Sequence, residues 1–282
     1  KEQKSLITHV EQKKTRFKDM IKIIFKNDQL VVIIIAIFLF NTGYFITTSL
    51  GIYFFNYDFN KYGGIEFTLF SAVLAVSQLS ALMLFPMLAK KMSRKKIFTM
   101  AIGMITVGYG LFMSVGYIFP MNMATIGLAG LVLFSGQGFI QVLVLVMLAD
   151  TIEYGQWKIG TRNESVVFAI NPFVTKLATS VQTFVVSVTL VASGLNSNVI
   201  KPVTDAKAAN PGMSNEDVRA LIASNVTEKM LLGLRTSMIV IPLILILVSY
   251  LIYRFKYKID AKFYSQITKE LTERIISEQQ EA

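Results

Sequence analysis

Residues Asp150 to Lys176 read DTIEYGQWKIGTRNESVVFAINPFVTK, and the interpretation of the whole chain depends on this stretch. Its first part, Asp150 to Asn163, is largely polar and charged and interrupts an otherwise apolar sequence. A second apolar run follows and carries Lys176. Ionised side chains are costly inside a bilayer, so intramembrane lysines face a bundle interior or a water-filled cavity and pair with carboxylates. The role of Lys176 therefore depends on the groups that it faces.

The composition is that of a protein that crosses a membrane several times. Of the 282 residues, 53% are hydrophobic and 16% are charged, and the mean hydropathy is +0.54. These values are too apolar for an ordinary soluble domain. Six apolar runs reach the length of about 20 residues that a helix needs to cross the hydrocarbon core of a bilayer. They lie near 30–55, 66–88, 97–118, 123–149, 164–193 and 231–253. The sequence thus predicts an all-α bundle of six transmembrane helices.

The apolar runs divide the chain into a first segment at 1–29, a bundle at 30–253 with an external connection at 194–230, and a tail at 254–282. Both end segments carry apolar residues at helical spacing, which predicts a helix against the membrane face at each end. These residues are Phe17, Met20, Ile21 and Ile24 in the first segment, and Phe263, Ile267, Leu271 and Ile275 in the tail.

Two details of the external connection and of the helix after it carry structural expectations. Ser214 and Asp217 have the spacing of a capping box, which predicts a short helix with its apolar side at Val218, Leu221 and Ile222. Arg235 opens the sixth span, and we expect its long side chain to extend outward to water.

The net charge of +10 follows the predicted topology. The basic residues crowd alternate connections, and the positive-inside rule therefore places both ends of the chain in the cytoplasm. The crowded regions are 1–26, 90–96, 158–162 and 254–274, which hold 21 of the 28 Lys and Arg residues. Basic stripes with interleaved aromatics do not occur in the predicted soluble regions, so the expected partner is the lipid bilayer and not nucleic acid.

Several functional classes find little support in the residues. The chain has no cysteine, which excludes disulfides and thiolate chemistry within it. Its single histidine is His9, and neither a zinc-protease, a serine-hydrolase nor a phosphate-loop motif is present, so an enzyme is not expected. We expect no cofactor and no metal site. A channel would not need the carboxylate partner that Lys176 requires, whereas a membrane scaffold or regulatory protein stays open as an alternative.

Polar residues recur on one face of several predicted spans. In the first span the stripe either lines a path or forms hydrogen bonds between helices. Two glutamines one turn apart in the fourth span predict a polar cavity, and the fifth span has a polar face too broad to lie against lipid. Gln78 in the second span and the glycines of the third are interpreted as packing residues. The polar sets are Asn41, Tyr44 and Thr48; Gln137 and Gln141; Asn171, Thr175, Thr179 and Gln182; and Lys176, Ser180 and Thr183.

The polar stretch carries a family resemblance. DTIEYGQWKIGTRNES, from Asp150 to Ser165, closely resembles the loop between the tenth and eleventh helices of the glycoside, pentoside and hexuronide cation symporters. Four further features fall where the C-terminal half of that family has them, so the resemblance covers essentially the whole chain. They are the segment KNDQ at 26–29 before the first span, the helix with Asn41, the basic loop at 90–96 and Lys176. Gln156 replaces the Glu that is usual after Tyr-Gly, and Gln141 stands where a member of the family has a sugar-contacting tryptophan.

The resemblance implies a twelve-helix major-facilitator fold, of which this sequence supplies the second six helices and part of the central loop. The partner is then an N-terminal six-helix half, and the protein lies in a bacterial plasma membrane. Its implied function is symport of a glycoside, pentoside or hexuronide with H+ or Na+ by alternating access, with a non-transporting scaffold or sensor as the alternative.

The resemblance also assigns residues. Lys176 matches a lysine that faces carboxylates at the cation site, and Asn171 matches a polar residue near the sugar. With the cavity-facing polar residues, the expected substrate site is Asn41, Tyr44, Gln137, Gln141, Asn171 and Thr175. The expected cytoplasmic gating loop carries Asp150, Glu153, Tyr154, Gly155, Lys158, Arg162 and Glu164, whose charges would pair in one conformation and separate in the other.

Overall fold

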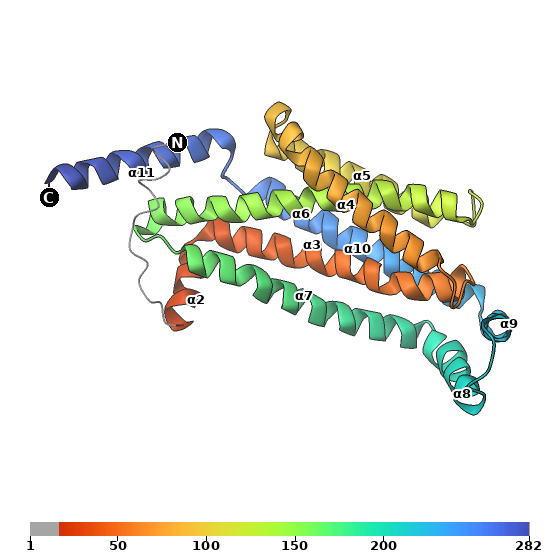
Figure 1. The fold of residues 1–282 in the computed structure, drawn as a ribbon. Helices are drawn as coiled ribbons and strands as arrows, with labels where there is room; N and C mark the ends of the chain where they lie inside the picture. Colours follow the sequence, from red (N-terminus) through yellow and green to blue (C-terminus); the bar gives the residue numbers. More distant parts are fainter. Residues whose placement is uncertain (1–16, 282) are drawn as a thin grey trace.

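The computed structural model describes residues 17–281, and the chain there is almost entirely helical (Figure 1). Six helices are long and apolar enough to cross a membrane, and they lie over the six predicted apolar runs. These are α3 (Asp28–Tyr53), which a π-helical turn at Phe54–Asp58 extends, α4 (Glu66–Lys91), α5 (Arg94–Ser114), α6 (Met123–Ile159), α7 (Glu164–Ala192) and α10 (Glu228–Lys256).

Shorter helices mark the two ends of the bundle. Helices α2 (Phe17–Lys26) and α11 (Ala261–Glu281) lie at one end, which we call the α2–α11 end (Figure 1). Helices α8 (Lys201–Ala209) and α9 (Asn215–Asn225) lie at the other, the α8–α9 end. The part of the sequence before residue 17, which includes His9, lies outside the described residues. The capping box of α9 is confirmed, because Ser214 accepts a hydrogen bond from the amide of Asp217 and the Asp217 carboxylate accepts one from the amide of Ser214.

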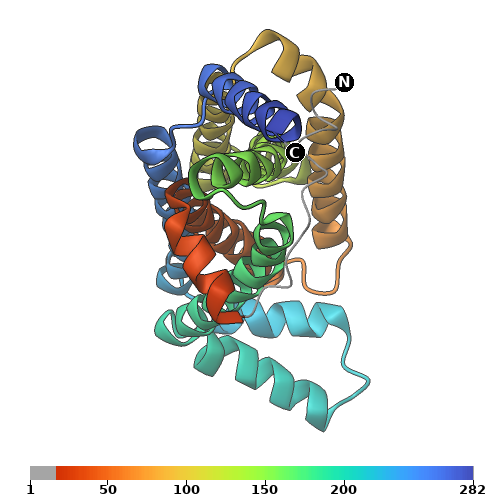
Figure 2. The same ribbon diagram turned by 90° about the vertical axis from the view of Figure 1, so that its left-hand side faces the viewer.

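The bundle consists of two groups of helices that meet along α3 and α6. Helix α3 packs against α10 and α7, and α6 packs against α5 and α4 (Figure 2). Small residues permit the closest approach: a Cβ atom on Gly108 of α5 would lie 2.7 Å from the Cα atom of Leu133 in α6. The predicted packing role therefore holds for Gly108. It is wrong for Gly103 and Gly110, which have no neighbouring atom within 4 Å of such a Cβ.

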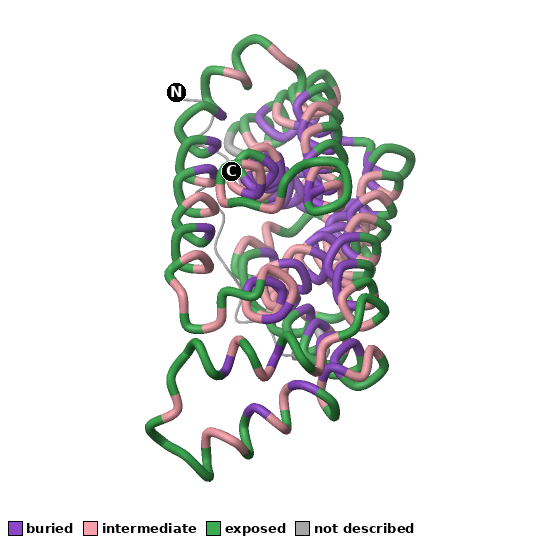
Figure 3. Tube along the Cα trace, turned by 90° about the vertical axis from the view of Figure 1, so that its right-hand side faces the viewer, coloured by how far each residue is buried: buried purple, intermediate pink, exposed green. Residues whose placement is uncertain are grey.

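The helices differ in how much of their surface the bundle covers. In the most apolar window of each helix, 56% of residues are buried for α3 and 61% for α6, against 17% for α4 and 22% for α7. Buried residues gather where the helices face one another, and exposed residues line the outer surfaces (Figure 3). Helices α4 and α7 thus present broad uncovered faces.

The predicted loop that begins at Asp150 is wrong for most of its length. Helix α6 continues to Ile159, and Gly160, with φ of 77°, ends it in the left-handed conformation that glycine adopts most easily. Charged residues can continue the helix because partners neutralise them: Asp150 pairs with Arg94, and Lys158 pairs with Asp28. Only 160–163 connect α6 to α7.

The outward orientation predicted for Arg235 is also wrong. Its side chain is buried and forms an ion pair with Asp58 at the end of the first span. The guanidinium additionally donates to the carbonyl oxygen of Val115, at 2.6 Å. An arginine near a helix end extends to water when no partner is available. Here the carboxylate and the carbonyl satisfy it inside the bundle.

Candidate functional site

A cavity of 610 Å³ lies among α3, α4, α6 and α7. Four of the predicted substrate residues line it: Asn41 from α3, Gln141 from α6, and Asn171 and Thr175 from α7. The Nδ2 atom of Asn41 donates to Oγ1 of Thr175 at 3.4 Å, which joins α3 to α7 at the cavity wall. The structure therefore brings together polar residues that are as far as 134 positions apart in the sequence.

Gln78 of α4 lines the same cavity and was interpreted from the sequence as a packing residue. Its Nε2 atom donates to the hydroxyl oxygen of Tyr44 at 2.9 Å, which places Tyr44 next to the wall through a side-chain contact. Ser71, seven residues earlier, shares its face, but one serine and one amide suit packing between helices as well as they suit a cavity. Apolar side chains such as Phe40 and Phe45 complete the lining. The cavity thus combines a few polar groups with a mainly apolar wall, as small-molecule sites commonly do.

Gln137 does not line the cavity, although it lies one turn from Gln141. It is fully buried, and its Nε2 atom donates to the hydroxyl oxygen of Tyr109 at 3.4 Å. The Tyr109 hydroxyl lies 2.6 Å from that of Thr47, which donates to the carbonyl oxygen of Met238. This chain links α6, α5, α3 and α10 behind the cavity wall. The prediction for Gln137 fails because residues four apart differ by about 40° around a helix, enough here to turn one toward the cavity and the other toward α5.

Lys176 lies on the exposed side of α7, next to Thr175 but turned away from it by the helical step. Among the described residues, no carboxylate lies within ion-pair distance of its ammonium group. Each hydroxyl near it on α7 donates a hydrogen bond to the backbone carbonyl oxygen four residues earlier. These hydroxyls extend the polar face of the helix beyond Lys176. They belong to Thr179, Ser180, Thr183 and Ser187, all exposed.

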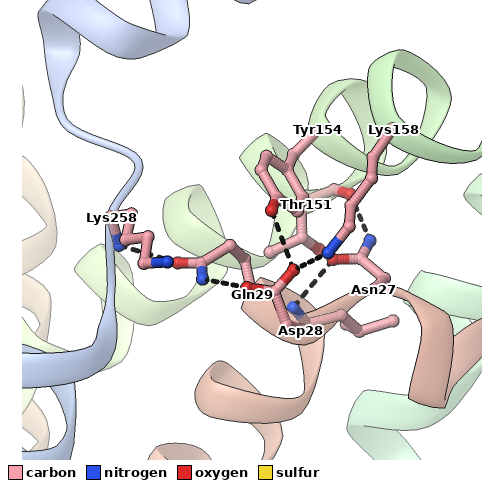
Figure 4. Close-up of polar contacts among 8 residues, drawn as sticks. Asn27, Asp28, Gln29, Thr151, Tyr154, Lys158 and Lys258 are labelled. Atoms are coloured by element: carbon pink, nitrogen blue, oxygen red, sulfur yellow. Dashed lines mark hydrogen bonds and ion pairs between the residues drawn. The ribbon is translucent and has the colours of Figure 1, made fainter.

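The α2–α11 end holds a second group of polar contacts, centred on Asp28 (Figure 4). The Asp28 carboxylate accepts hydrogen bonds from the Tyr154 hydroxyl and from Nε2 of Gln29, each at 2.8 Å, and pairs with Lys158. Gln29 in turn accepts a bond from the amide of Lys258 at 2.7 Å. The start of α3 is thereby fixed to the end of α6 and to the segment that follows α10.

Asn27 and Gly155 form the closest approach in this group. Asn27 caps α3 by accepting from the amide of Leu30 at 3.0 Å, and its Nδ2 atom donates to the carbonyl oxygen of Thr151 at 2.8 Å. A Cβ atom on Gly155 would lie 2.8 Å from that Nδ2 atom. Of Asn27, Leu30, Thr151 and Gly155, only Gly155 was predicted from the sequence to belong to the site.

The remaining charged residues of the predicted gating loop are also paired within this chain. Arg162 lies 3.5 Å from Glu153 and 3.0 Å from Glu164, and it donates to Oε1 of Gln156 at 3.2 Å. Asp150 pairs with Arg94 at the start of α5. The charges therefore tie α5, α6 and α7 together at this end.

Comparison with known proteins places this geometry in a family. The family described as MFS/sugar transport protein matches residues 1–261. The chain belongs to this family. The resemblance to the glycoside, pentoside and hexuronide cation symporters is thereby confirmed, and six apolar helices in a member of this family make the chain a multi-pass membrane protein.

Individual members of the family show the same relationship. The lactose permease of Leuconostoc lactis is 34% identical over 198 residues, which are 70% of this chain and 30% of that protein. The lactose permease of Lactobacillus helveticus is 28% identical over 275 residues, 98% of this chain and 38% of that protein. The raffinose carrier protein of Pediococcus pentosaceus is 30% identical over 179 residues, 64% and 27% of the two chains. The chain thus spans well under half the length of these relatives.

Proposed function

We propose that the chain is the C-terminal half of a twelve-helix transporter that couples the uptake of a glycoside, pentoside or hexuronide to a cation gradient. The observation that carries this proposal is the 610 Å³ cavity, in which amides from four helices meet beside aromatic side chains. Buried amides and hydroxyls that pair with sugar hydroxyls give strong discrimination, because a ligand without those hydroxyls leaves them unpaired. The names of the relatives, lactose permease and raffinose carrier protein, support a sugar as the substrate.

The partner in this proposal is an N-terminal six-helix half. Its support is the pair of uncovered faces on α4 and α7, which flank the cavity. Lipid can cover the apolar residues of α4, but it cannot satisfy the ammonium group of Lys176 on α7. A second half would close the cavity, and rocking of one half against the other would expose it to each side in turn.

Lys176 is the proposed coupling residue. Lys176 follows Glu164 by twelve residues, a rise of about 18 Å along α7. In a helix that spans the bilayer, this distance from the helix start corresponds to a depth near the bilayer centre. At that depth Lys176 requires carboxylates, and the second half is the proposed source. The coupling ion is H+ or Na+. Binding of the cation to these carboxylates would compete with their pairing to Lys176. The Lys176 ammonium group would therefore affect both cation binding and sugar binding.

The proposed location is a bacterial plasma membrane with both ends of the chain in the cytoplasm. The charge distribution supports it, because the basic segments 90–96 and 254–274 lie at or next to the α2–α11 end. The polar contacts at that end are within this chain. We therefore propose that the gating residues hold the ends of α3, α5, α6 and α7 together as one body, which moves as a unit in transport.

The test uses the full-length protein in vesicles with an imposed cation gradient. Asn171→Ala and Gln141→Ala each remove a polar group from the cavity wall, and we expect weaker sugar binding and slower uptake at matched expression. Ser71→Ala is the control, because Ser71 lies exposed on α4 and bonds to the carbonyl of Phe67 outside the cavity. Unchanged sugar binding in both cavity variants would move the site elsewhere.

A further inference from the structure

A second hollow, which we call the α7–α10 groove, lies between the end of α7 and the start of α10, at the α8–α9 end and apart from the first cavity. Its volume is 420 Å³. Most of its lining surface is apolar, and one basic residue and several hydroxyls stand within it. The lining residues are Thr189, Ala192, Ser193, Lys229, Leu232, Gly233, Thr236 and Ser237. A Cβ atom built on Gly233 would lie 3.2 Å from the Cβ atom of Ser193. The end of α7 and the start of α10 are therefore close together at one side of the hollow.

Three of the four hydroxyls of this groove differ from those on the exposed face of α7; the fourth, on Ser193, donates to the carbonyl oxygen of Leu190 at 3.4 Å. Thr183 and Ser187 donate to the carbonyl four residues earlier, as is usual for hydroxyls in a membrane helix. Among the described residues, Thr189, Thr236 and Ser237 make no such bond and have no other side-chain partner. Thr189 is only 6% exposed. Its hydroxyl nevertheless keeps some accessible surface, so this hydroxyl and those of Thr236 and Ser237 can donate to a ligand in the groove.

The depth of the groove matches the layer of lipid headgroups. Helix α7 ends at Ala192 and α10 begins at Glu228, so Lys229 stands at the limit of the spanning helices. Thr236 lies seven residues further along α10, about 10 Å deeper. Headgroups and glycerol esters occupy a layer of about 5–8 Å on each side of the hydrocarbon core, so the distance from Lys229 to Thr236 spans this layer and reaches the edge of the core.

An apolar hollow of 310 Å³ adjoins the groove on the same helix. It is lined by Phe184, Ser187, Val188, Val191 and Ala192, and Ala192 also lines the α7–α10 groove. From Ala192 back to Phe184 the helix rises about 12 Å toward the membrane centre. A molecule with a polar head and an apolar chain can therefore occupy both hollows at once.

We propose that this groove binds a phospholipid with an anionic headgroup. The Lys229 ammonium pairs with the phosphate at the water boundary. Thr189, Thr236 and Ser237 donate hydrogen bonds to the ester carbonyls one layer deeper, and an acyl chain follows the apolar side of α7. Lys229 is one of few basic residues at the α8–α9 end, where the positive-inside rule does not favour a lysine. Its position beside hydroxyls without a partner is instead explained by pairing with a lipid phosphate.

The experiment compares lipid retention by the full-length protein in native mass spectrometry, with phosphatidylglycerol and phosphatidylcholine of identical acyl chains. We expect the wild type to retain one phosphatidylglycerol. Lys229→Gln should lower that retention about fivefold, the effect of one basic residue near an anionic lipid. Thr189→Val, which preserves side-chain shape, should lower retention of both lipids. Lys201→Gln is the matched control, because Lys201 is exposed on α8 and outside the groove.

Two results would overturn the proposal. Equal phosphatidylglycerol retention by the wild type, Lys229→Gln and Thr189→Val would show that the retained lipid is not in this groove. Displacement of the lipid by millimolar inorganic phosphate would show a site for a small soluble anion. Sugar uptake is not the readout, so the lipid site can fail while the proposed transport function stands, and the reverse also holds.

Discussion

Asp58 and Arg235 form an ion pair that is buried on both sides, although 177 residues separate them in the sequence. Nη2 of Arg235 donates to the Asp58 carboxylate at 2.9 Å, and the guanidinium lies 4.9 Å from the ring centre of Tyr117 and 5.5 Å from that of Phe54. The pair joins the end of the first span, the α5–α6 connection and α10 at the α8–α9 end. Because every polar group of the junction has a partner, removing one partner should be costly.

Arg235→Met should destabilise the protein by about 3–5 kcal/mol, because it leaves the Asp58 carboxylate buried without its cation. The double variant Asp58→Asn with Arg235→Met should recover part of that loss. Thermal unfolding of the detergent-solubilised protein measures both. Arg254→Met, an exposed arginine on the same helix, serves as the control. A single variant as stable as this control would contradict the structural role of the pair.

Gly155→Ala should destabilise the α2–α11 end. The new methyl group would lie 2.8 Å from Nδ2 of Asn27, which must move away from the carbonyl of Thr151. Overpacking of this kind costs about 1–3 kcal/mol. Gly103→Ala is the matched control, because no atom lies within 4 Å of its new methyl group. It should stabilise α5 by about 0.5–1 kcal/mol. Equal melting temperatures of the two variants would be inconsistent with the contact.

Lys176→Met should abolish gradient-driven sugar accumulation by the full-length protein while leaving membrane insertion intact. The neutral side chain would leave the proposed partner carboxylates without their counterion, which would raise their pKa values and disturb cation affinity and uptake together. Sugar accumulation under an imposed proton or sodium gradient, at matched membrane expression, is the measurement. Lys201→Met on α8 is the control. Full accumulation by the Lys176 variant would rule out an essential coupling role.

Docking of the tail helix α11 should weaken in acid. Trp157, the only tryptophan of the chain, donates through Nε1 to Glu270 at 2.6 Å. This hydrogen bond, with a second from Gln266, lowers the pKa of Glu270 in the folded protein. The stabilisation is therefore complete above the ordinary pKa of glutamate and is lost as pH falls through the lowered value.

Trp157 fluorescence of the 282-residue chain reports this change directly. We expect an emission change in acid that matches the change seen at neutral pH in Glu270→Gln. Glu273→Gln is the control, because in the part of the chain that the structure describes Glu273 pairs with Lys269 on α11 itself and with no residue of α6. An acid transition of the same size and midpoint in Glu270→Gln would assign it to another group.

The sequence by itself determined the elements and their faces. The length of each apolar run determines whether the helix can cross a membrane. Asn171 and Thr175 share a face because they lie four residues apart on one helix, which the sequence alone shows. The capping box at Ser214 and Asp217 was predictable for the same reason, since both residues belong to one turn. The family resemblance added the expected place of Lys176.

Only the tertiary structure decided which of those faces meet. Gln141 lines the cavity and Gln137 is buried behind it, because the packing of α6 against α5 sets the rotation of the helix. Gln78 joins the cavity through α4, which no local pattern indicates. The polar stretch from Asp150 stays helical to Ile159 because its charges find partners on distant helices. Such ion pairs join residues that are far apart in the sequence. Burial of a charged side chain is unfavourable without a partner and tolerated with one, and spacing along the chain does not show which case applies.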